Sequence, residues 1–164
     1  MEIYQMIVAL HVIATILGTG GATIAEFQIN RAIKDKRVSD DERALMHVNY
    51  GMIRVGMALM IISIVAMFWY HLGQGNQFIL TSEKLWIKEL MFVAIILNAV
   101  ALHKRWVPLW LGASISFTSW WGATLLGMAG RLPYDFTTYL IGYVVAIFVV
   151  SYLLHLVRRF SRAR

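Results

Sequence analysis

Two basic side chains stand inside long apolar runs of this chain, and both have chemistry available to them. His11 lies in the first run and Lys88 in the third. A histidine in an apolar helix is a candidate axial ligand of haem, above all where small residues further along the helix leave room for the macrocycle. Those small residues are Gly18 and Gly21. The alternative is a neutral histidine that is hydrogen-bonded to a neighbouring helix.

Lys88 has three candidate roles, as a haem ligand, as the partner of a haem propionate or as a proton relay. A charged group in hydrocarbon costs roughly 2.5–3.5 kcal/mol on insertion scales, so it normally faces a partner, a cavity or a cofactor. The alternatives are a side chain that extends to the membrane surface, or a pair with Glu83 or Glu89. Asn98, further along the same run, is another candidate for contact with the cofactor.

A second group of polar residues lies toward the other ends of the runs. His47 and His103 are further candidate metal ligands, and Glu26 and Arg54 are a candidate ion pair inside the membrane. With Asn98, these residues also form a candidate polar track for an ion. Thioethers bind Cu(I), but the methionines of the second run follow no single stripe, so we interpret them as core packing.

Five apolar runs position these residues and predict five transmembrane helices. The chain has 164 residues, of which 59% are hydrophobic and 15% charged, whereas a soluble domain carries about 25% charged residues. Runs of about twenty apolar residues cross a hydrocarbon core about 30 Å thick, where each helix satisfies its own backbone groups. We therefore predict one all-α transmembrane domain, with helices at about 3–29, 44–72, 83–103, 109–129 and 136–157.

The basic residues predict the orientation of this bundle in a bacterial-type inner membrane. Eleven of the fifteen lysines and arginines lie within residues 31–43, 104–105 and 158–164. Because cytoplasmic loops collect basic residues, the N-terminus is expected outside and the C-terminus in the cytoplasm. The same distribution argues for the lipid bilayer and against nucleic acid as the partner, despite a net charge of +6. Cysteine is absent, which excludes thiolate metal sites.

Two stretches resemble a family of small membrane proteins. Residues 10–22, LHVIATILGTGGA, are similar to the opening of the CopD-like group, which includes the copper-resistance D domain and the HemJ-type protoporphyrinogen oxidases. Residues 86–105, WIKELMFVAIILNAVALHKR, are similar to a later helix of that group. In the HemJ-type proteins the early histidine and this lysine are associated with b-type haem, which implies the same role for His11 and Lys88. Asn98 stands where the oxidase subgroup tends to have a histidine, and the tryptophan expected beside the first glycines is missing, so the resemblance implies haem more than the oxidase activity.

The leading expectation is an inner-membrane protein that binds b-type haem or a related tetrapyrrole, with His11 as axial ligand and Lys88 or a second histidine as its partner. It would act in electron transfer or as a haem-dependent oxidoreductase. The alternatives are an ion, proton or copper transport protein, and a structural subunit or assembly factor. In the last case the small residues of the fourth run would pack against a partner or a second copy. They are Gly112, Ser116, Ser119, Ala123 and Gly127.

Overall fold

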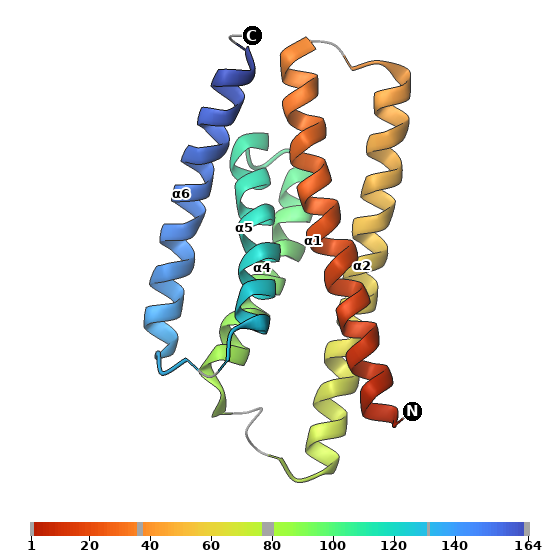
Figure 1. Ribbon diagram of the computed structural model, residues 1–164, viewed down its shortest axis with the longest axis vertical. Coiled ribbons are helices and arrows are strands. Elements are labelled where there is room, and N and C mark those ends of the chain that lie inside the picture. Colours follow the sequence, from red (N-terminus) through yellow and green to blue (C-terminus); the bar gives the residue numbers. More distant parts are fainter. Residues whose placement is uncertain (1, 36–37, 77–80, 131, 163–164) are drawn as a thin grey trace.

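Five α-helices account for most of the chain in the computed structural model, which describes residues 2–35, 38–76, 81–130 and 132–162. The helices are α1 (Ile3–Asp35), α2 (Asp40–Gly73), α4 (Glu83–His103), α5 (Leu109–Met128) and α6 (Phe136–Arg162). No strand occurs within the described ranges. Figure 1 shows the helices running up and down beside one another. The all-α prediction is confirmed.

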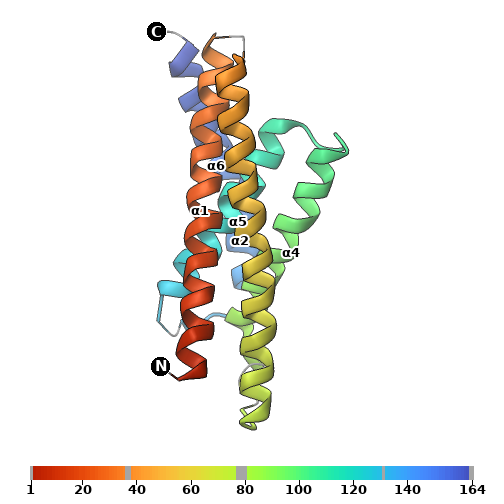
Figure 2. The ribbon, with the colours of Figure 1, turned by 90° about the vertical axis from the view of Figure 1, so that its right-hand side faces the viewer.

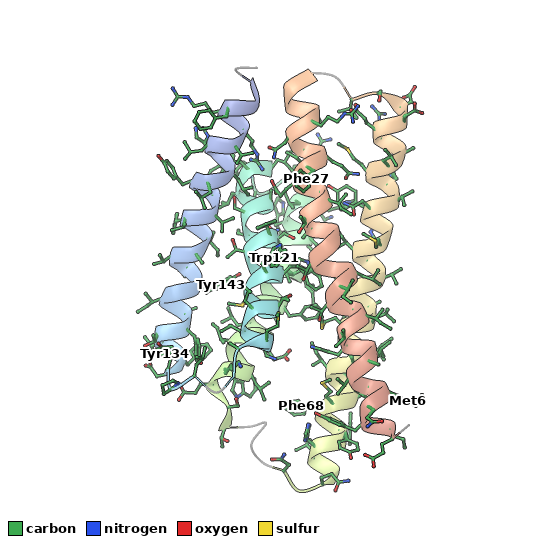
Figure 3. All side chains as sticks on the ribbon, in the orientation of Figure 1. Met6, Phe27, Phe68, Trp121, Tyr134 and Tyr143 are labelled. Atoms are coloured by element: carbon green, nitrogen blue, oxygen red, sulfur yellow. The ribbon has the colours of Figure 1, made fainter. Side chains whose placement is uncertain are left out.

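Four of these helices, α1, α2, α4 and α6, are long and apolar enough to cross a membrane, which indicates a multi-pass membrane protein. The fifth, α5, contains several hydroxyl side chains, and Ser114, Thr118 and Ser119 are buried inside the bundle. Ser119 Oγ lies 2.6 Å from the hydroxyl of Tyr143, which Figure 3 shows on α6 beside α5. Ser114 and Ser119 donate to carbonyls of α5 itself, whereas the buried hydroxyl of Thr118 has no partner among the described residues. These hydroxyl groups are turned away from lipid.

The helices extend beyond the apolar runs that predicted them. A helix of 33 residues, such as α1, is about 50 Å long and exceeds the hydrocarbon core. The next helix, α2, begins in the charged segment, where Ser39 and Glu42 form a reciprocal capping box. Arg31 bonds the same carboxylate of Glu42 at 2.8 Å. At the start of α4, Ser82 is the N-cap, and its hydroxyl accepts a 3.4 Å bond from the N–H of Leu85.

The helices form two antiparallel hairpins, α1–α2 and α4–α5, with α6 packed beside the second. The middle helix is α5, which contacts α4, α6 and α1. In Figure 2 it lies between α6 and α4. The second hairpin therefore meets the first mainly through the α1–α5 contact, where Trp121 Nε1 donates to Thr23 Oγ1 at 3.0 Å.

The two ends of the bundle differ in charge. The end of α1, the start of α2 and the end of α6 lie together at one end in Figure 1, and the turn between α4 and α5 points the same way. This is the basic end, which carries Arg31, Arg43, Lys104, Arg105, Arg158 and Arg159. The N-terminus and the start of α6 lie at the opposite end. The two termini thus lie at opposite ends of the bundle, and which end faces the cytoplasm stays a prediction.

The small residues of α5 pack mainly within the chain. A Cβ added at Gly112 would lie 2.5 Å from the side chain of Leu102 on α4, and Ser119 is fully buried against α6. Gly127, by contrast, is exposed, and a Cβ added there would have nothing within 4 Å. The face predicted to meet a second copy is thus largely covered by α4 and α6.

The first turn of α6 has a titratable cap, for which we expect an acid-sensitive effect. Asp135 accepts hydrogen bonds from the hydroxyl and the backbone N–H of Thr138, and these bonds hold the pKa of Asp135 below its usual value of 3.8. Because the pKa is lower in the folded state, the cap stabilises α6 above the unfolded pKa, and the effect is lost as pH falls through the folded pKa.

An Asp135→Asn variant keeps a capping side chain that does not titrate. Amide hydrogen exchange at Thr138 and Tyr139, corrected for intrinsic rates, should therefore accelerate in acid in the wild type and not in the variant. Equal acceleration in both proteins would contradict the assignment of the cap.

Candidate functional site

His11 is half-buried between α1 and α2 and has a defined hydrogen-bonding state. Its Nδ1 lies 3.0 Å from Oγ of Ser63, and that hydroxyl donates its proton to the carbonyl of Met60 at 2.9 Å. A serine hydroxyl has only one proton, so Ser63 accepts the Nδ1–H of His11. The tautomer that results has a lone pair on Nε2, which finds no hydrogen-bond partner within the described part of the chain.

This arrangement is the one expected of a histidine that ligates a metal. Such a histidine usually donates its other ring N–H to a fixed acceptor, which sets the tautomer and the orientation of the ring. The bond to a neighbouring helix, which was the alternative interpretation of His11, is therefore present. It leaves the second nitrogen available to a ligand.

Lys88 approaches the same region from α4. Its side chain is half-buried, and it forms no hydrogen bond or salt bridge with any residue in the described ranges. The ammonium of Lys88 is next to Glu89 in the sequence and close enough to His11 to influence that ring electrostatically. Glu89 lines a groove of about 510 Å³ on the side of α4 that faces Phe136. Lys88 therefore lies within electrostatic range of His11, and no hydrogen bond joins the two side chains among the described residues.

The glycines predicted to make room for a macrocycle are in contact with protein instead. A Cβ added at Gly18 would overlap the six-membered ring of Trp120, which is only 2% exposed. A Cβ at Gly21 would lie 2.5 Å from Ile53 on α2. Any flat ligand near His11 therefore has to lie beyond Trp120, on the side toward the N-terminal end of α1. His11 is two helical turns closer to that end of α1 than Gly18 is.

Asn98 connects the helices of the second hairpin. It is buried, and its Nδ2 donates to the carbonyl of Gly112 at 2.7 Å. Asn49 repeats the pattern in the first hairpin, where Nδ2 donates to the carbonyl of Gly21 at 3.0 Å. Asn98 lies ten residues along α4 from Lys88, or about 15 Å. Its hydrogen bond joins α4 to α5, while its Oδ1 is buried without a partner among the described residues.

The other predicted residues lie near the basic end and do not form one track. His47, Arg54 and His103 are exposed. Glu26 pairs with Arg158 of α6, with Oε2 2.8 Å from Nη2, and not with Arg54 as expected. No group of three histidine, aspartate or glutamate side chains that could hold a metal ion is found among the residues described.

Sequence reasoning missed two residues: Ser63, which holds His11, and Arg158, which pairs with Glu26 near the basic end. Ser63 is completely buried. It belongs to one helical face of α2 with Asn49, Gly56 and Met60. In chain order these four residues are separated by seven, four and three positions. That helical spacing was the signal in the sequence for a buried stripe that carries polar residues.

Comparison with known proteins finds no family model, no curated protein and no solved structure that matches the chain. The resemblance to the CopD-like group stays a prediction.

Proposed function

We propose that this multi-pass membrane protein binds b-type haem, or a related tetrapyrrole, between the α1–α2 hairpin and α4. The observation that carries the proposal is the state of His11, whose Nδ1 is held by Ser63 and whose Nε2 has a free lone pair. His11 would be the axial ligand. Bound haem supplies one-electron redox chemistry, which suits electron transfer or a membrane oxidoreductase acting on a tetrapyrrole or quinone.

Lys88 supports the proposal because its ammonium lacks an acceptor among the described residues. A cation within an apolar helix is costly unless it is paired, and haem propionates are carboxylates that would pair with it. We assign Lys88 to a propionate. A Lys88→Gln variant should then bind haem more weakly and keep the absorption maxima of the wild type. Shifted maxima would show instead that the lysine amine is the second axial ligand.

The proposed orientation follows from the basic end. Cytoplasmic loops of inner-membrane proteins collect lysine and arginine, which assigns the basic end to the cytoplasm and the N-terminus to the outer side. All five helices, α5 included, would then cross the bilayer, and the His11 site would lie in its outer half. Residues 10–22 and 86–105, which resemble the CopD-like group, contain the two residues assigned to haem.

Substitution of His11 tests the ligand. Chain purified from cells supplied with haem should lose its Soret band in His11→Ala. His47→Ala is the matched control, since it removes an exposed histidine of α2 and should leave the spectrum unchanged. Ser63→Ala should keep the band but bind haem about 10–100-fold more weakly, because it removes the group that orients the ligand.

A full Soret band in His11→Ala would place the ligand elsewhere. The structural-subunit alternative makes the opposite prediction, namely that a His11→Ala, Lys88→Ala double variant leaves both activity and spectra unchanged.

A further inference from the structure

A groove of about 440 Å³ lies between the first turn of α5 and the second half of α6. It is near the basic end, at the opposite end of the bundle from His11. This volume is within the range of ligand sites, roughly 300–1,000 Å³. Its lining consists of Trp110 from α5 and Phe148, Ser151, Tyr152, His155 and Arg158 from α6.

The polar groups of this lining favour an anion. Arginine and the tryptophan indole are donors only, while serine, tyrosine and histidine can also donate, and no carboxylate takes part in the lining. A ligand that combines acceptor oxygens with an apolar part therefore matches the groove better than a cationic one.

Arg158 has donors to spare. Its Nη2 is bonded to Glu26 and its Nε is buried, but its Nη1 makes no bond to the described residues and is the donor left for a ligand. The side chain is only 11% exposed. A planar guanidinium with unused N–H groups is well suited to phosphate oxygens.

The surroundings of the groove indicate that its ligand comes from the bilayer. Phe148 and Tyr152 line it and are 68% and 64% exposed, on the face of α6 that has no helix packed over it. An apolar wall next to one arginine and two hydroxyl groups matches the boundary between acyl chains and headgroup. The start of α5 adds a helix N-terminus that has no side-chain cap and no acidic residue in its first turn.

We propose that this groove binds one anionic phospholipid. The phosphate lies against Arg158 and His155, and the acyl chains lie along Phe148 and Tyr152. Glu26 holds Arg158 from the side of α1, so the guanidinium bridges the interior ion pair and the lipid. This site is separate from the haem proposal and stands without it.

The test uses the full chain in nanodiscs that contain equal amounts of phosphatidylglycerol and phosphatidylcholine with identical acyl chains. Native mass spectrometry then measures which lipid stays bound. The wild type should retain phosphatidylglycerol selectively. His155→Ala should lower that selectivity about tenfold and Tyr152→Phe about threefold, from the loss of a charge-assisted and of a neutral hydrogen bond.

Arg159→Ala is the matched control, because it removes an exposed cation next to Arg158 that does not line the groove. It should leave the selectivity unchanged. His155 and Tyr152 are exposed, so their variants should fold like the wild type, which thermal unfolding verifies. Equal retention of the two lipids would overturn the proposal. If Arg159→Ala lost as much selectivity as His155→Ala, binding would depend on diffuse surface charge, which would also overturn the proposal. Displacement of the lipid by inorganic phosphate would indicate a site for small anions and would overturn it as well.

Discussion

Replacement of Glu26 by leucine is expected to destabilise the bundle by roughly 3–5 kcal/mol, because it leaves a buried guanidinium without its counter-charge. The side chains of Glu26 and Arg158 are 7% and 11% exposed, and the bonded atoms are 2.8 Å apart. The helix that carries Arg158, α6, has few buried residues in its membrane-crossing part, so this pair is a large share of its attachment to α1. Unfolding in detergent, followed by helical circular dichroism, measures the effect.

Two variants separate the ion pair from general damage. Glu26→Leu with Arg158→Leu should recover most of the lost stability, since replacing both partners by apolar residues is often nearly neutral. Arg31→Gln breaks the pair with Glu42, in which the arginine side chain is 73% exposed, and should change stability by less than about 1 kcal/mol. If Glu26→Leu alone were as stable as the wild type, the pair would not hold α6 to α1.

Gly18→Ala is expected to have the second large effect, a loss of about 1–3 kcal/mol or more from overpacking. The added methyl group would overlap the indole ring of Trp120, which is buried in a core cluster shared by α1, α2, α4 and α5. Gly56 of α2 also packs on the backbone of Gly18. A Cβ added at Gly56 would lie only 3.0 Å from the backbone nitrogen of Gly18. Neither neighbour is the flexible end of a long side chain, so α5 has to move away from α1.

Gly20→Ala is the control for this prediction. It lies two residues away in the same helix, and nothing is within 4 Å of an added Cβ. Alanine has the higher helix propensity, so Gly20→Ala should be neutral or stabilising by up to about 1 kcal/mol. Trp120→Leu in the Gly18→Ala background should restore part of the loss by removing the overlapping ring. Equal stability of the two alanine variants would contradict the packing of Trp120 on Gly18.

The helices were predictable because a segment in lipid has to satisfy its backbone groups internally, so that a long apolar run indicates a helix. Their ends were less predictable, since α1 continues to Asp35, past the apolar run that ends at about residue 29. The depths of His11 and Lys88 followed from the rise per residue, and Lys88 lies within electrostatic range of His11.

The partners of these residues were not predictable in the same way. A glycine such as Gly18 lets a helix, an aromatic ring or a ligand approach equally well, and only the tertiary packing decides that Trp120 takes the place. Glu26 had two possible cations at its depth. Arg54 belongs to an outward face of α2, so the distant Arg158 forms the pair. Hydropathy determines depth along a helix but not its rotation about the axis.

The reduced-minus-oxidised absorption spectrum of the purified chain, from cells supplied with haem, tests the haem proposal most directly. We predict a Soret band and the bands of a b-type haem at about one haem per chain, with His11 as the ligand. A chain that is folded by circular dichroism and shows no Soret band under these conditions would contradict the proposal.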